Sequence, residues 1–82
     1  EMQNSQIDIE NARLESEKRE ANGDVEKARV RLDQAKREAD RVQRLFDGKA
    51  ASLKQLQTAQ SERDAAQADY DSAVRRRDAL NT

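Results

Sequence analysis

The chain has 82 residues, of which 40% are charged, 34% hydrophobic and 2% aromatic, and sixteen Lys and Arg balance seventeen Asp and Glu to a formal net charge of −1. This length allows one domain at most. Because thirteen of the apolar residues are alanine, few side chains are large enough for a thick globular core. The charge balance argues against a nucleic-acid-binding protein, which needs a basic face. No apolar run approaches the roughly 20 residues of a membrane span.

The residue types of catalytic and metal sites are missing or dispersed. The chain has no His and no Cys, which removes the commonest bases, nucleophiles and soft metal ligands. Its carboxylates are spread among basic neighbours, a pattern typical of a solvated helix surface. A search for a nucleophile, a base and an orienting group therefore finds no candidates. We expect no enzymatic activity, no cofactor and no metal.

Residues 1–46 carry a heptad repeat, the pattern of a coiled coil. The absence of proline and the abundance of good helix formers favour a helix over disorder. Spacings of four and three residues alternate along one seam, which is apolar at every position from Ala21 onward. Its members are Ile7, Asn11, Leu14, Lys18, Ala21, Val25, Ala28, Leu32, Ala35, Ala39, Val42 and Phe46. We expect these residues to form the contact face of the first arm.

Gly23 lies where this arm could break, because Asn22-Gly23-Asp24 could end one helix and cap the next. The seam nevertheless passes from Ala21 to Val25 in phase, which a break would usually disturb. We predict one continuous helix that tolerates the glycine at a cost of about 1 kcal/mol. A broken helix is the alternative.

Residues 47–51 are the predicted turn. Gly48 suits the left-handed residue that closes a helix, because it has no Cβ. Ser52 and Gln55 match a capping box, which begins a second helix. The second arm, residues 52–82, has a poorer seam, in which the aliphatic stems of two arginines could lie along the contact. This seam comprises Ser52, Leu56, Ala59, Arg63, Ala66, Tyr70, Ala73, Arg77 and Leu80.

The two seams match if the arms fold back antiparallel. Phe46 then faces Ser52. The residue numbers of every further facing pair add up to the same total as those of Phe46 and Ser52, and in most of these pairs a large side chain meets a small one. These pairs include Val42 with Leu56, Ala39 with Ala59, Leu32 with Ala66, Ala28 with Tyr70 and Val25 with Ala73. We therefore predict an all-α fold, an antiparallel two-helix coiled-coil hairpin with an Ala-rich heptad seam. The same register requires a partner for Leu14 two positions beyond Thr82. Either the first helix overhangs the second, or the chain is a fragment of a larger protein, and we expect the fragment.

Three residues around the turn carry a more specific pattern. Arg41, Leu45 and Ser52 form R-x3-L-x6-S across it. With the Gly48 turn and the Ala-rich second arm, this pattern resembles the periplasmic adaptor family, also called membrane fusion proteins, the HlyD-like components of tripartite efflux pumps and type 1 secretion systems. The resemblance covers the whole chain as one hairpin. Ala50-Ala51 departs from it, because the family often has a larger aliphatic residue before the serine.

The resemblance implies a location and partners. Such a protein lies in the periplasm of a Gram-negative cell, attached to the inner membrane, and its hairpins assemble side by side. Domains absent here would reach an inner-membrane transporter, and the hairpin tip would dock onto a TolC-like outer-membrane channel. Carried over to this sequence, the docking residues are Arg41, Leu45 and Ser52.

The heptad positions agree with a docking role. Arg41 and Leu45 are four residues apart, so they are neighbours on one helical face. They fall at heptad positions c and g, which point sideways and outward rather than across to the partner arm. An apolar side chain beside a planar donor suits an interface.

Two other readings are open. Leu45 could instead cover the end of the seam, and the chain could be a purely structural coiled-coil arm or stalk. A nucleic-acid-gripping hairpin is a further alternative, since several basic residues gather near the turn, namely Arg37, Arg41, Arg44, Lys49 and Lys54.

Overall fold

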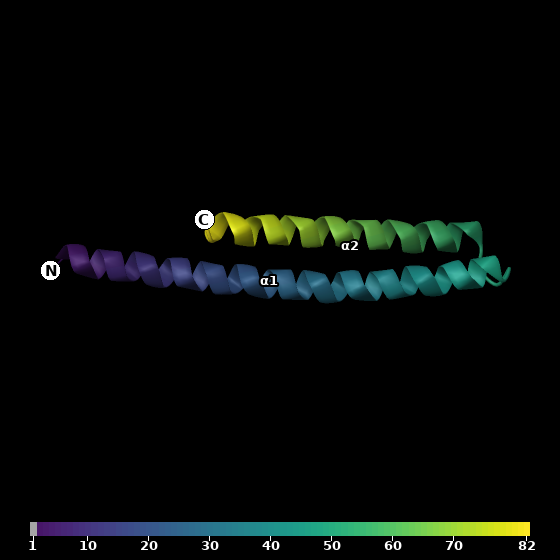
Figure 1. The fold of residues 1–82 in the computed structure, drawn as a ribbon, viewed down its shortest axis with the longest axis horizontal. Coiled ribbons are helices and arrows are strands. Elements are labelled where there is room, and N and C mark those ends of the chain that lie inside the picture. Colours follow the sequence, from purple (N-terminus) through teal and green to yellow (C-terminus); the bar gives the residue numbers. More distant parts are fainter. Residues whose placement is uncertain (1) are drawn as a thin grey trace.

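Two helices joined by a tight turn make up the computed structural model, which describes residues 2–82 and the side-chain burial from Asn4 onward. Helix α1 spans Met2–Asp47 and helix α2 spans Leu53–Leu80. The helices lie side by side and run in opposite directions (Figure 1). The molecule is a rod of 72 × 15 × 14 Å. The predicted all-α helical hairpin is confirmed.

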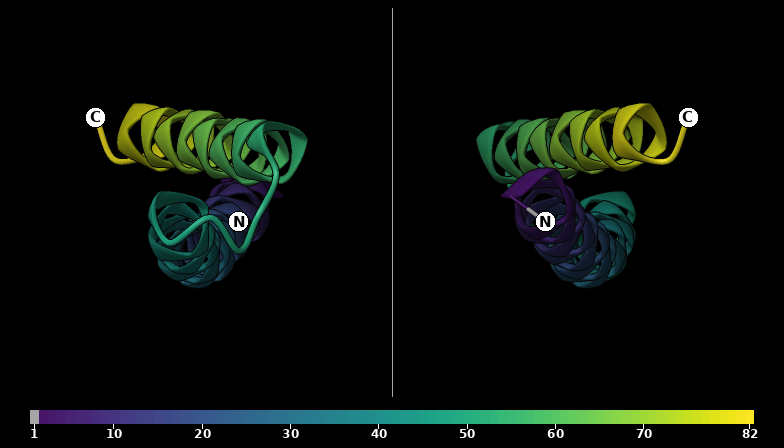
Figure 2. Two further views of the ribbon diagram at one scale, coloured as in Figure 1. Left: turned by 90° about the vertical axis from the view of Figure 1, so that its right-hand side faces the viewer. Right: turned by 90° about the vertical axis from the view of Figure 1, so that its left-hand side faces the viewer.

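The core is a single thin seam between the helices. In the described part of the chain every buried residue is hydrophobic and lies on one of the two predicted seams. Most other seam positions of α2, including Arg63 and Tyr70, are half-buried. Figure 2 shows the helices crossing obliquely when the rod is viewed from either end. The buried residues are Ala21, Val25, Ala28, Leu32, Ala39, Val42, Leu56 and Ala59.

The pairing of the arms follows the predicted register at both ends of the contact. Near the turn, two of the predicted pairs, Val42 with Leu56 and Ala39 with Ala59, form one buried cluster. Far from the turn, the register places residue 76 opposite residue 22. There Arg76 lies 2.9 Å from a carboxylate oxygen of Asp24 and 4.0 Å from one of Glu20, on either side of that point.

Helix α1 continues through Gly23 without interruption. A Cβ added at Gly23 would meet nothing within 4 Å, so packing does not require a glycine there. The prediction of a continuous helix is confirmed. Hydrogen bonds along the helix and the in-phase seam on both sides outweigh the conformational freedom that one glycine adds.

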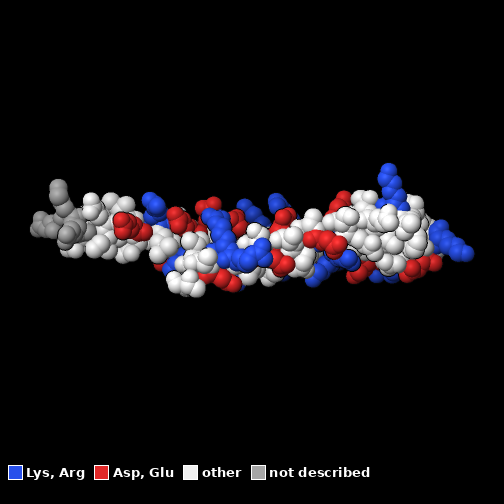
Figure 3. All heavy atoms as spheres, turned by 90° about the horizontal axis from the view of Figure 1, so that it is seen from above, with Lys and Arg blue, Asp and Glu red and all other residues white. Residues whose placement is uncertain are grey.

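The N-terminal part of α1 extends beyond α2 (Figure 1). On the face seen in Figure 3, acidic and basic side chains are interspersed along the middle of the rod, and a broad uncharged area with charged side chains at its margins lies near the turn.

A groove at the hairpin tip

The end of α1 is closed by a Schellman motif, with hydrogen bonds from Lys49 N to Phe46 O at 2.9 Å and from Ala50 N to Leu45 O at 2.6 Å. The left-handed residue of this motif is Lys49, with φ 63°, and neither glycine has positive φ. The prediction that Gly48 is the left-handed residue is therefore wrong. The helix runs one residue further than predicted, to Asp47, and Gly48 N still donates to Arg44 O at 3.0 Å. The left-handed turn of the backbone therefore occurs at Lys49, directly after Gly48.

Helix α2 begins with the predicted capping box. The Ser52 hydroxyl accepts a hydrogen bond from Gln55 N at 3.0 Å, and the Gln55 side-chain oxygen accepts one from Ser52 N at 2.8 Å. Both bonds satisfy backbone donors that have no partner within the helix. Ser52 thus fixes where the second arm starts, with Leu53 as its first helical residue.

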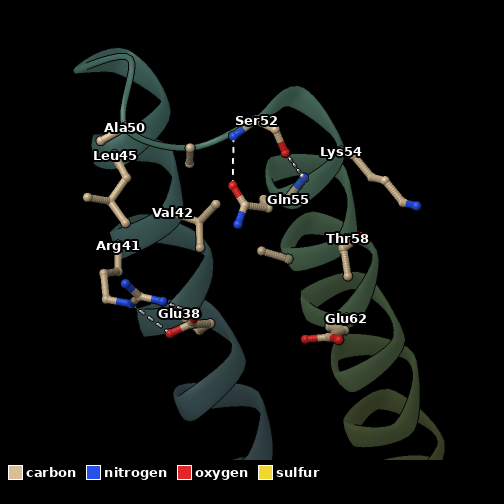
Figure 4. A pocket seen from close by; sticks show the side chains of 12 residues that line it. Glu38, Arg41, Val42, Leu45, Ala50, Ser52, Lys54, Gln55, Thr58 and Glu62 are labelled. Atoms are coloured by element: carbon tan, nitrogen blue, oxygen red, sulfur yellow. Dashed lines mark hydrogen bonds and ion pairs between the residues drawn. The ribbon is translucent and has the colours of Figure 1, made fainter.

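A groove of about 420 Å³ lies between the two helices next to the turn (Figure 4). Its apolar lining includes the buried core residues Val42 and Ala59, and charged side chains from both helices complete its walls. All three docking residues predicted from the sequence line it. The full lining is Glu38, Arg41, Val42, Leu45, Ala50, Ala51, Ser52, Lys54, Gln55, Thr58, Ala59 and Glu62.

Arg41 is exposed and pairs with Glu38 one turn earlier on α1. Its Nε and Nη2 donate to the two carboxylate oxygens of Glu38 at 3.0 and 2.6 Å (Figure 4). This hydrogen bond lowers the pKa of Glu38 and raises the pKa of Arg41. A guanidinium has five N–H donors, so three stay available to a binding partner.

Leu45 is half-buried and lines the groove together with Ala50. In a Schellman motif these are the two positions that commonly make a hydrophobic contact. Leu45 therefore serves the turn and is also partly accessible from the groove. The sequence placed Leu45 at a g position, which points sideways and outward, and in the structure it lies at the edge between the two arms.

The wall that α2 contributes was not predicted as part of the site. It consists mainly of Gln55, Thr58 and Glu62, with Lys54 nearby. A periodic signal for this wall exists in the sequence. Glu38 and Leu45 are seven apart on α1, and Gln55 and Glu62 are seven apart on α2. In an antiparallel pair such rows border the same side of the seam.

These features define a two-helix coiled-coil hairpin with a grooved tip. No helix in the described residues is long and apolar enough to cross a membrane. Within the same part of the chain, no group of three or more acidic side chains is arranged to hold a metal ion. Comparison of the chain with protein-family models, with curated proteins and with solved structures gave no match.

Proposed function

We propose that this hairpin is the channel-docking arm of a Gram-negative periplasmic adaptor in a tripartite export system. The observation that carries the proposal is the convergence of Arg41, Leu45 and Ser52, from both arms, on one groove at the tip. These residues carry the resemblance to the adaptor family, and the fold brings them together although the turn separates them in sequence.

The geometry suits a mechanical role. The rod is 72 Å long, and the groove lies beside the turn, at the end opposite the N-terminus (Figure 1). A tip so placed can contact a TolC-like outer-membrane channel while the other end is held near the inner membrane. The protein then bridges distance and recognises a partner without carrying out chemistry.

The groove offers an apolar floor and a polar rim, the usual anatomy of a protein interface. An apolar side chain of the channel would contact Leu45 and Val42, and the free donors of Arg41 would bind backbone carbonyls or a carboxylate. Ser52 is already committed to its helix cap, and its hydroxyl proton can still be donated to a partner.

The rest of the assembly follows from the same proposal. Other domains of a longer protein would contact the inner-membrane transporter and attach the adaptor to that membrane. Several hairpins would stand side by side in the periplasm. Their exposed faces carry interspersed charges of both signs (Figure 3), which suits lateral polar contacts between neighbours.

A structural arm without a tip partner is the second candidate. It is favoured by the local partners of two motif residues, since Arg41 pairs with Glu38 and Ser52 caps its own helix. Under this reading the motif only builds the turn.

Site-specific crosslinking in cells separates the two candidates. A photoreactive residue replacing Leu45 in the full-length protein is expected to crosslink to the outer-membrane channel, and Leu45→Asp and Arg41→Asp are expected to abolish export at unchanged protein level. A carboxylate facing an apolar surface lacks a partner. Val30→Asp is the matched control, because Val30 is an exposed apolar residue of the same helix away from the tip. Export that survives both tip substitutions, with no crosslink, would establish the structural arm.

A further inference from the structure

Along one edge of the seam, residues of the two helices face each other in pairs that recur every seven positions. The first pair is observed directly, since Arg76 Nη1 donates to a carboxylate oxygen of Asp24 at 2.9 Å. One and two heptads nearer the turn, the same spacing gives two further facing pairs. They are Arg31 with Asp69 and Glu38 with Glu62. The first two pairs join opposite charges, whereas the third sets two carboxylates opposite each other.

The third pair lies at the tip groove. Glu38 and Glu62 both line it, from facing helices and at its end away from the turn (Figure 4). Arg41 pairs with Glu38, whereas Glu62 forms no ion pair with any described residue. The other cation in the lining, Lys54, has its side chain directed away from the groove (Figure 4). One negative charge at this end of the groove is therefore not neutralised by the described part of the hairpin.

The remainder of the groove is uncharged. Leu45, Ala50 and Ser52 lie toward the turn (Figure 4), and the buried residues Val42 and Ala59 contribute apolar surface between the helices. A Lys or Arg side chain matches such a groove, because its aliphatic stem packs on apolar groups while its charged end reaches a carboxylate. The groove thus has a complementary place for each part of a basic side chain.

Docking makes a counter-charge more important than it is in the free hairpin. Glu38 and Glu62 are exposed, so water and salt screen their repulsion. A partner that covers the groove removes this water, and the carboxylate of Glu62 is then buried without a counter-charge, which is unfavourable. A cationic group supplied by the partner removes both the burial cost and the repulsion. The charge pattern therefore selects one chemistry for the occupant.

We propose that the tip groove binds a Lys or Arg side chain of the docking partner, with its charged end between Glu38 and Glu62. The aliphatic stem of this side chain lies on Val42 and Ala59, and an apolar residue of the same partner segment lies toward Leu45. The inference rests on the proposed docking function. It adds the chemistry and the direction of the segment that docks, which is apolar near the turn and basic away from it.

Charge reversal in the full-length protein tests the proposal, with the photoreactive residue at position 45 as the reporter. Glu62→Lys is expected to reduce the crosslink to the outer-membrane channel at least about tenfold, because it sets two cations against each other in the groove. Glu62→Gln should reduce it less. Asp64→Lys is the matched control and should leave the crosslink unchanged. Asp64 is exposed, lies two residues away on the same helix and does not line the groove.

A reciprocal exchange identifies the partner residue. Mass spectrometry of the crosslinked product locates the channel segment, in which we expect a Lys or Arg. Replacing that residue by Glu should weaken the crosslink to the unmodified hairpin and restore it, together with export, in the Glu62→Lys protein.

Thermal unfolding of the 82-residue chain separates lost docking from lost folding. Glu62→Lys should not lower the melting temperature, because it gives Glu38 a facing cation in the same relation as Arg76 to Asp24. A crosslink that Glu62→Lys leaves undiminished, or a channel segment without Lys or Arg, would overturn this inference while the docking function stands. The absence of any crosslink in the unmodified protein would overturn both.

Discussion

Arg76 of α2 donates to Asp24 of α1 across the hairpin, with its Nη1 2.9 Å from the carboxylate oxygen, although the two residues are 52 positions apart in sequence. Both side chains are partly solvent-exposed, so the pair adds little to stability, as is usual for surface ion pairs. This ion pair instead shows which turns of the two helices lie opposite one another.

The first prediction concerns this register. Cysteines replacing Val25 and Ala73 should form an intramolecular disulfide on mild oxidation, because the register pairs these positions across the seam and a disulfide requires close Cβ atoms. The shift in electrophoretic mobility of the monomer measures it. Cysteines at Val25 and Leu80, one heptad out of register, should stay reduced under the same conditions. The opposite pattern would show that the arms pair differently.

The second prediction concerns the turn and tests whether Lys49 or Gly48 is the left-handed residue. Lys49→Gly should raise the free energy of unfolding by about 1 kcal/mol, since a residue with a Cβ is strained in the left-handed region. Lys49→Ala, which keeps the Cβ, serves as the control and should not give this gain. Thermal unfolding followed by circular dichroism measures both.

Gly48→Ala completes the comparison. The added Cβ would lie 3.5 Å from Arg44 O and 3.7 Å from Leu45 O, which are ordinary contacts, so this change should be neutral or slightly stabilising. If Gly48→Ala markedly destabilised the fold and Lys49→Gly gave no gain in the free energy of unfolding, Gly48 and not Lys49 would be the left-handed residue.

The third prediction concerns the thin seam. Much of it is alanine, and each buried alanine removes little apolar surface from water, so the chain should unfold broadly and at low temperature. Leu32 is 4% exposed, and Leu32→Asp should abolish the helical signal at room temperature, because it buries an unpaired charge. Circular dichroism at micromolar concentration is the measurement.

Val30→Asp is the matched control for that change. Val30 lies two residues away on the same helix and is 42% exposed, so its replacement should leave the melting temperature almost unchanged. A sharp transition of the unmodified chain above roughly 80 °C would contradict the expectation of marginal stability.

The fourth prediction concerns pH. The hydrogen bond from Arg41 lowers the pKa of Glu38 in the folded state, so this pair stabilises the fold at pH values above the unfolded pKa of roughly 4.3. The stabilisation is lost as pH falls through the lowered folded pKa. Urea unfolding at pH 7 should therefore show Glu38→Gln to be less stable than the unmodified chain, and the difference should vanish near pH 2.

Glu62→Gln is the control for the pH dependence. Glu62 lines the same groove from α2 and forms no ion pair among the described residues. Its replacement should give a smaller change at pH 7. A Glu38→Gln difference that persists unchanged to low pH would mean that the Arg41 pair does not contribute to stability.

The amino-acid sequence by itself determined the fold, the contact face and the pairing of the arms. Heptad spacing selects one face of each helix, and the chain has few large apolar residues outside that face. Residues such as Leu32 and Val42 could therefore be buried only in the seam between the two helices. The large-to-small matching between the seams then selected the register. The capping box at Ser52 could also be predicted from the sequence, because it depends only on two residues that lie three positions apart in the chain.

Only the tertiary structure decided the details of the tip. The left-handed residue is Lys49 and not the predicted Gly48, because the hydrogen bonds that close α1 form one residue later in the chain than the sequence pattern predicted. The pairing of Arg41 with Glu38 depends on the side-chain rotamers, which spacing alone does not specify. The groove itself exists only where the edges of the two helices meet, so its α2 wall is fixed by packing between residues that are distant in sequence.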